Sequence, residues 1–217
     1  IAIFSPGLLG GSLVKTILQR LPGVEVRVWA RREDAVEEVR REFPSVITSS
    51  SIADSIRGVS LAVLCMPVQH MQGVALQIAD CDLSDDLIVT DVGSVKGSVV
   101  AELEPVFDGT KACFIGSHPM AGSQRTGLAH ARGDLFYQSA CLITPTEKTK
   151  REDHDRIRSF WIKLGCRVRE MTPQKHDHCV ARISHLPHAM AVLTTLAALH
   201  DDASVLDNSA GGFRDTT

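Results

Sequence analysis

The residue best suited to acid–base chemistry in this sequence is His118, which lies in the segment GSHPMAGS (residues 116–123) after an apolar run. Small residues and a proline surround this histidine, a composition typical of places where a ligand comes close to the backbone. With an ordinary pKa near ~6.5, an imidazole can accept a hydroxyl proton at neutral pH. His118 is therefore a candidate general base, and a hydrogen-bonded histidine at a strand end is the structural alternative.

Polar or conformationally special residues follow three consecutive apolar runs, LAVLCMP, DLIVTDVG and CFIGSHP. They are Met66 and Pro67 at the end of the first run, where they are expected to contact the nicotinamide half of a cofactor. The others are Asp91, Gly93, Ser94 and Lys96 after the second strand, and Ser117 and His118 at the end of the third. Because the carboxyl ends of parallel strands meet at one edge of an open sheet, we expect a ligand site there, with Ser94 facing His118. Room for the ligand is expected beside Gly116, Ala121 and Gly122.

A glycine-rich turn follows the first apolar run, where IAIF leads through SPGLLGGS (residues 5–12) into a helical pattern. This is nearly the GxGxxG dinucleotide motif, with Ser5 in place of the first glycine. Gly7 would let the backbone approach a pyrophosphate, and Gly10 would allow close packing of helix on strand. Leu8 and Leu9 lie between them, in the turn that presents backbone amides to the phosphates.

The end of the second predicted strand bears on the choice of dinucleotide. An NAD enzyme typically carries a carboxylate there, whereas this chain has Arg31 and Arg32. An arginine pair suits a 2′-phosphate, so NADP is favoured over NAD. In the alternative interpretation these arginines pair with Glu33 or Asp34 on a surface helix, and NAD remains open.

Strand-like runs alternate with helical patterns over most of the chain, which predicts an α/β fold with a doubly wound, mostly parallel Rossmann-type sheet over residues 1–172. After Met171 no β-run follows, and residues 173–217 are predicted to begin an incomplete all-helical domain. We expect Pro187 to kink or divide its helix. This segment holds His176, His178, His185 and His188. We expect His178 and His185 in the core, and no metal site, because cysteine and acidic ligands are not clustered nearby.

The composition is that of an ordinary globular chain: 217 residues, 44% hydrophobic and 23% charged, with a formal net charge of −3. Mixed charges argue against a nucleic-acid partner, and no apolar run is long enough for a membrane span. Six scattered cysteines are expected to be buried thiols in a reducing compartment, which favours the cytoplasm. Since the sequence starts in a strand without methionine, the alternative that an organelle leader has been removed remains open.

Five motifs together resemble those of prephenate dehydrogenases and the related arogenate dehydrogenases. They are, in order, PGLLGGS, DVGSVK, GSHPMAGS, SHLPHAMA and GGFRDTT, and the resemblance covers almost the whole chain. It implies an N-terminal dinucleotide domain, a C-terminal helical domain and a homodimer formed through that helical domain. It also implies oxidative decarboxylation of prephenate to 4-hydroxyphenylpyruvate in tyrosine biosynthesis, with hydride transfer to NAD(P).

The resemblance also implies roles for individual residues. His118 would assist deprotonation of the substrate's ring hydroxyl, and Ser94 would hydrogen-bond near it. His188 would bind substrate from the helical domain, with His176 as a further residue of the site wall. Ser117 is predicted to contact the substrate because of its place beside His118 at the strand end.

This chain departs from the family pattern at three places. Ser5 replaces a glycine, and Gln124 stands where some members carry an acid. The family's arginine for a substrate carboxylate would follow Thr217, and Arg214 is not that position.

Three alternatives to prephenate oxidation remain open from the sequence. The substrate could be arogenate. A β-hydroxyacid or imine-reducing dehydrogenase is disfavoured, because such enzymes rely on a helical-domain lysine that SHLPHAMA lacks. A non-catalytic nucleotide sensor would bind the cofactor without turnover.

Overall fold

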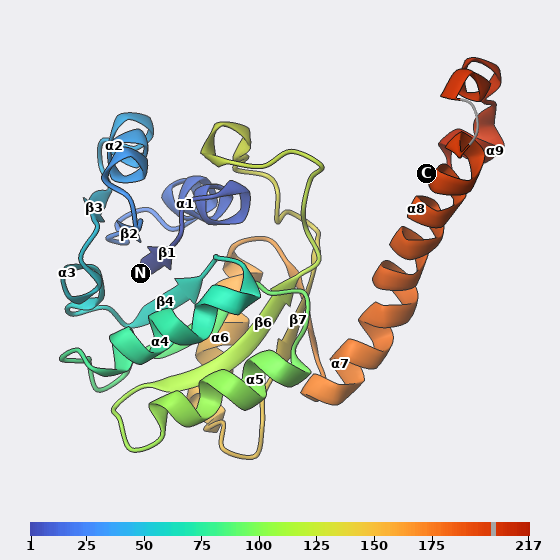
Figure 1. Cartoon of the computed structure of the whole chain (residues 1–217). Coiled ribbons are helices and arrows are strands. Elements are labelled where there is room, and N and C mark those ends of the chain that lie inside the picture. Colours follow the sequence, from blue (N-terminus) through green and yellow to red (C-terminus); the bar gives the residue numbers. More distant parts are fainter. Residues whose placement is uncertain (201–202) are drawn as a thin grey trace.

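The computed structural model describes residues 1–200 and 203–217, and its centre is one eight-stranded sheet of order β3-β2-β1-β4-β5-β6-β7-β8 (Figure 1). The strands are β1 (Ala2–Phe4), β2 (Arg27–Trp29), β3 (Ile47–Ser49), β4 (Leu61–Leu64), β5 (Ile88–Asp91), β6 (Cys113–Pro119), β7 (Ala140–Thr144) and β8 (Arg167–Glu170). From β3 to β6 all neighbours are parallel, β7 runs antiparallel to β6, and β8 is parallel to β7.

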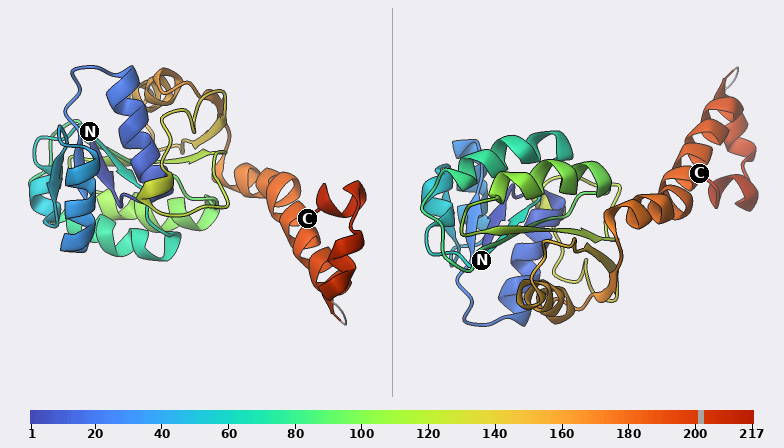
Figure 2. Two further views of the ribbon diagram at one scale, coloured as in Figure 1. Left: turned by 90° about the horizontal axis from the view of Figure 1, so that it is seen from above. Right: turned by 90° about the horizontal axis from the view of Figure 1, so that it is seen from below.

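Helices cover both faces of the sheet, which confirms the doubly wound prediction (Figure 2). One face carries α1 (Leu8–Arg20), α2 (Glu33–Glu42) and α6 (Arg151–Lys163), and the other carries α3 (Ile52–Ile56), α4 (Met71–Ala79) and α5 (Gly97–Leu103). Side chains alternate between the two layers along each strand: Ile3 packs in one core, whereas Ala2 and Phe4 pack in the other. Burial on both faces is why these strands read as continuous apolar runs.

Two short elements, β3 and α3, lie between α2 and β4, where neither a strand nor a helix is predicted from the sequence. The edge strand β3 has three residues and is buried at none of them. The following α3 has five residues and is capped by Ser51, whose side chain accepts a hydrogen bond from the amide of Asp54. Segments this short carry too few apolar residues to show a period.

Beyond the sheet, the chain continues as a long helical arm that projects from the α/β domain (Figures 1 and 2). The arm comprises α7 (Pro173–Val180), a π-helical turn η4 (Ala181–His185) and α8 (Leu186–Leu199), followed by η5 (Ala203–Asn208) and α9 (Gly211–Arg214). Pro187 does not divide the helix. Instead, the turn before it widens, with the Leu186 amide bonded to the Ala181 carbonyl, and this accommodates a residue that has no N–H of its own.

Among the helices of residues 1–200 and 203–217, none is long and apolar enough to cross a membrane. All six cysteines are free thiols, but only Cys141 and Cys166 are buried. The prediction of buried thiols is therefore wrong for the four that are partly exposed, Cys65, Cys81, Cys113 and Cys179.

Candidate active site

The position of His118 follows from the length of β6. Pairing with β5 ends at Ile115, opposite Thr90, and β6 then continues for four residues that pair only with β7. His118 lies in this extension, past the carboxyl end of the neighbouring parallel strand, and is 8% exposed. The sheet therefore delivers this imidazole to the edge where ligands of open α/β sheets bind.

His118 is the first member of a chain of three side chains. Its Nδ1 lies 2.9 Å from Nε2 of His176, and Nδ1 of His176 lies 2.8 Å from Oδ1 of Asp177. His176 is fully buried and both of its ring nitrogens are hydrogen-bonded, so it has no surface left for a substrate. The structure therefore places His176 behind His118 rather than in the wall of the substrate site.

Burial and neighbouring positive charge keep both histidines neutral. Desolvation is the largest cause that lowers the pKa of His118, followed by the electrostatic effects of His176, Lys96 and His185. Asp177 opposes them, and the pKa of His118 is about 3. Desolvation also lowers the pKa of His176, although the hydrogen bond to Asp177 opposes it. A neutral imidazole at physiological pH has the lone pair that a base requires.

A buried ion pair holds the turn between β5 and α5 against β6. Asp91 and Lys96 are both fully buried, and the Lys96 ammonium donates to Oδ2 of Asp91. The carboxylate also accepts from the backbone amides of Gly93, at 2.7 Å, and Ser117, at 3.1 Å. Asp91 thus ties the turn that carries Ser94 to the strand that carries His118.

Ser117 and Gly116 have structural roles instead of the predicted ligand contacts. Ser117 is fully buried, and its hydroxyl accepts from Thr90 at 2.8 Å and from the Trp161 indole at 3.0 Å. At Gly116, an added Cβ would collide with the Thr144 hydroxyl, so this space is already filled by protein. Alternation along β6 explains Ser117, because its side chain points to the face opposite that of Gly116 and His118.

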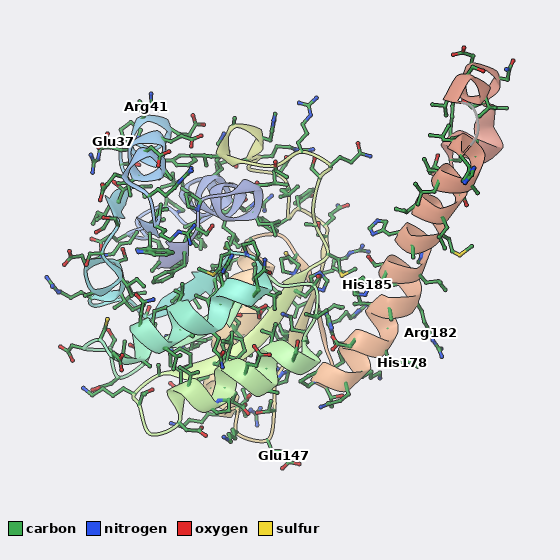
Figure 3. All side chains as sticks on the ribbon, viewed as in Figure 1. Glu37, Arg41, Glu147, His178, Arg182 and His185 are labelled. Atoms are coloured by element: carbon green, nitrogen blue, oxygen red, sulfur yellow. The ribbon has the colours of Figure 1, made fainter. Side chains whose placement is uncertain are left out.

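The remaining predicted residues are accessible. Ser94 is exposed in the β5–α5 turn and His188 is exposed on α8, so both can meet a ligand, although neither bonds to His118. His178 and His185 are also exposed, which corrects the prediction that they are core residues. In Figure 3 His185 lies on the side of the arm that faces the sheet, and its charge lowers the pKa of His118.

A cleft of about 590 Å³ adjoins the glycine-rich turn. Its lining includes five predicted cofactor residues, Gly7, Arg31, Arg32, Met66 and Pro67. The cleft is also lined by four residues that were not predicted: Gln69, His70, Gly127 and Leu128. Gln69 and His70 lie in the short turn after Pro67, whereas Gly127 and Leu128 come from a loop far from the glycine-rich turn in sequence.

The two motif glycines differ in role. A Cβ on Gly7 would meet nothing within 4 Å, which leaves the backbone open to a phosphate. Gly10 is buried against the Ser5 carbonyl oxygen, so it serves the packing of α1 on β1. Leu8 and Leu9 are half-buried in the first turn of α1. The cleft and the open amides fit a dinucleotide.

Ser5 occupies the first glycine position of the motif with a φ of +82°, a conformation that costs free energy for any residue with a Cβ. We expect Ser5→Gly to raise the free energy of unfolding by about 1 kcal/mol, measured by urea denaturation. Ser5→Ala is the control, because it keeps the Cβ and should give no such gain. Equal effects of the two variants would show that the backbone is not strained there.

Comparison with known proteins agrees with this geometry. Residues 20–170 match the family model for the prephenate dehydrogenase nucleotide-binding domain, and residues 172–217 match that for the prephenate dehydrogenase dimerization domain. Cyclohexadienyl dehydrogenase of Zymomonas mobilis is 32% identical over the whole chain, which spans 74% of that protein. Prephenate dehydrogenase of Lactococcus lactis is 31% identical, and here the chain spans 60% of the relative.

A solved structure gives the same result. The crystal structure of prephenate dehydrogenase from A. aeolicus, in complex with hydroxyphenyl propionate and NAD⁺, superimposes with a TM-score of 0.87 at 28% identity. The match covers 99% of this chain and 75% of that one. Together with the cleft beside the glycine-rich turn, these matches show that the chain belongs to the prephenate dehydrogenase family of NAD(P)-dependent oxidoreductases.

Proposed function

We propose that this protein catalyses the NAD(P)-dependent oxidative decarboxylation of prephenate to 4-hydroxyphenylpyruvate. The observation that carries the proposal is His118, a neutral imidazole with an unbonded Nε2 at the sheet edge that also bears the dinucleotide cleft. Family membership decides against the β-hydroxyacid and imine-reducing alternatives. Arogenate, which offers the same ring hydroxyl, is the alternative substrate.

The chemistry asks little of the protein beyond orientation and proton removal. A bound nicotinamide supplies the hydride acceptor. Nε2 of His118 accepts the proton of the ring hydroxyl while carbon dioxide leaves and the ring becomes aromatic. Ser94 hydrogen-bonds the hydroxyl from the β5–α5 turn, and His188 binds the substrate from the helical arm; both are accessible for this.

We propose NADP as the preferred cofactor and NAD as the alternative. Arg31 and Arg32 line the cleft after β2, where a carboxylate for the ribose 2′-hydroxyl would otherwise stand. Arg32 also lies 3.3 Å from Asp34, but both side chains are about 70% exposed and the pair is weak enough to open for a phosphate. The A. aeolicus structure contains NAD⁺, so the cofactor needs its own test.

The double variant Arg31→Ala/Arg32→Ala is expected to raise the Kd for NADP by about 10- to 100-fold, the scale of lost charge-assisted hydrogen bonds. The Kd for NAD should change little, because NAD lacks the 2′-phosphate. Isothermal titration with both cofactors measures this. Arg40→Ala/Arg41→Ala removes the same charge from α2, where Arg41 marks the outer surface (Figure 3), and should spare both affinities. Equal losses for NADP and NAD would contradict the phosphate assignment.

We also propose which part of the chain forms each domain. Residues 1–172 form the dinucleotide domain, and residues 173–217 form part of a helical substrate and dimerisation domain. Support for a homodimer comes from the dimerization-domain match and from the apolar side chains that α8 exposes: Leu186, Met190, Val192, Leu193 and Leu196. We further propose a cytoplasmic site of action, consistent with six free thiols.

The test is steady-state kinetics of the full-length protein with prephenate and arogenate, each with NAD and NADP. The highest kcat/KM is expected for prephenate with NADP. A higher value for arogenate would reassign the substrate. Cofactor binding without turnover in all four combinations would indicate a nucleotide sensor instead.

A further inference from the structure

We propose that Asp177 is a positioning residue which, through His176, fixes His118 in the tautomer that leaves Nε2 free to take the substrate proton. The proposal rests on the proposed function, and it adds a residue from the helical arm to the machinery of the base. Asp177 lies in α7, whereas His118 lies in β6, 59 residues earlier in the sequence.

The direction of each hydrogen bond follows from Asp177. Its carboxylate is anionic: burial would raise its pKa, but bonds from His176 and from the amides of Lys96 and Gly97 lower it. An anionic carboxylate only accepts, so Nδ1 of His176 carries the proton of the 2.8 Å bond. Since His176 is neutral and its Nδ1 is protonated, its Nε2 carries a lone pair and can only accept. The proton of the 2.9 Å contact must therefore belong to Nδ1 of His118. Nε2 of His118 is then the unprotonated nitrogen.

The opposite tautomer is disfavoured by the same geometry. With a proton on Nε2 of His118, two lone pairs would face each other at 2.9 Å inside the protein. A buried acceptor without a donor costs free energy, so the bonded arrangement predominates. His118 has no other protein partner at either ring nitrogen within residues 1–200 and 203–217 that could set its tautomer.

Asp177 is itself held in place by the sheet domain. Oδ1 accepts from the backbone amide of Lys96 at 2.7 Å, and Oδ2 accepts from that of Gly97 at 2.8 Å. These bonds join α7 to the first residues of α5 and orient the carboxylate toward His176. The competent tautomer of His118 therefore depends on the docking of α7.

The proton balance is simple. The hydroxyl proton forms an N–H bond at Nε2 of His118 as its O–H bond breaks, and a nicotinamide bound in the cleft would accept the hydride, which leaves a ring ketone. Carbon dioxide then leaves, and the electron pair of its C–C bond makes the ring aromatic and its oxygen anionic. His118 is then a cation that still donates from Nδ1 to His176. The negative charge of Asp177 stabilises this cation through His176. The proton goes back to the ring oxygen when loss of carbon dioxide has made that oxygen a phenolate, so the product leaves as a phenol and His118 is neutral again.

The first measurement reads the tautomer directly. In ¹⁵N NMR spectra of the histidine rings in the full-length protein, His118 is expected to be protonated at Nδ1 and unprotonated at Nε2. In Asp177→Ala it should shift to a mixture of both tautomers. A proton on Nε2 in the wild type, or an unchanged His118 in the variant, would overturn the proposal. This readout needs no turnover, so it stays decisive even if the proposed substrate is wrong.

The second measurement is kinetic. Asp177→Ala is expected to lower kcat by about 10²-fold while the KM values for substrate and cofactor change less than about threefold. Asp177→Asn keeps an oxygen for His176 and should recover part of this loss. Thr172→Ala, which removes the side-chain cap of α7 without touching either histidine, should leave kcat within about twofold.

A double variant separates positioning from a structural role. If Asp177 acts through His118, Asp177→Ala should have no further effect in a His118→Asn background. A further loss of about 10²-fold in that background, or a wild-type kcat in Asp177→Ala, would overturn the proposal. Absence of turnover in the wild type would instead count against the proposed function alone.

Discussion

His118→Asn is expected to lower kcat with prephenate by about 10³-fold, the usual contribution of a general base. Asparagine can still donate a hydrogen bond to Nε2 of His176, so the fold of β6 should persist, but it has no nitrogen lone pair that accepts a proton. The Kd values for NAD and NADP should remain within about threefold, because the cleft lining does not include His118. Stopped-flow absorbance of the reduced nicotinamide and cofactor titration measure the two quantities.

His130→Asn is the matched control for this experiment. His130 is exposed on the short turn η3 (Leu128–His130), so its replacement should leave kcat unchanged. Wild-type turnover in His118→Asn would remove His118 from the mechanism. A parallel loss of cofactor affinity would mean that the substitution disturbed the sheet edge as a whole.

Lys96→Met should produce the largest loss of stability, roughly 3 to 5 kcal/mol, because it leaves the fully buried Asp91 carboxylate without its cation. The Asp91 carboxylate also accepts hydrogen bonds from the amides of Gly93 and Ser117. A carboxylate that moves without its cation would therefore displace both the turn with Ser94 and the strand with His118. Chemical denaturation gives the free energy of unfolding, and kcat is expected to fall with it.

The control for Lys96→Met is Lys148→Met, which breaks an ion pair with Asp108 whose side chains are both more than half exposed. Water and salt already screen such a pair, so the free energy of unfolding should stay close to that of the wild type. If both variants lose the same stability, burial of the Asp91–Lys96 pair does not increase its contribution to the free energy of unfolding.

Much of the fold was predictable because the sheet is covered on both faces. Long apolar runs such as LAVLC marked central strands, and periodic helices such as α1 and α6 were long enough to show their spacing. The edge strand β3 was missed since three half-exposed residues carry no such signal. The reversed direction of β7 and β8 depends on tertiary pairing, which no local pattern specifies.

Site residues at strand ends were predictable from the sequence. Contacts that form only when α7 packs against the sheet were not. His118 and the glycine-rich turn lie at the carboxyl edge as the topology requires. The wrong assignment of Ser117 to the substrate came from treating β6 as finished, whereas it continues beside β7 and turns that hydroxyl into the core. The role of Asp177 depends on contacts with Lys96 and Gly97, some 80 residues away in sequence.

Conversion of prephenate by hydride transfer with loss of carbon dioxide is the reaction that we propose for this protein. Its most direct test is a mass balance on the full-length wild-type protein, in which reduced nicotinamide, carbon dioxide and 4-hydroxyphenylpyruvate are quantified in one reaction. We predict equal amounts of the three products, formed catalytically. Saturable binding of NAD or NADP in the same sample, with neither carbon dioxide nor 4-hydroxyphenylpyruvate formed, would contradict the claim.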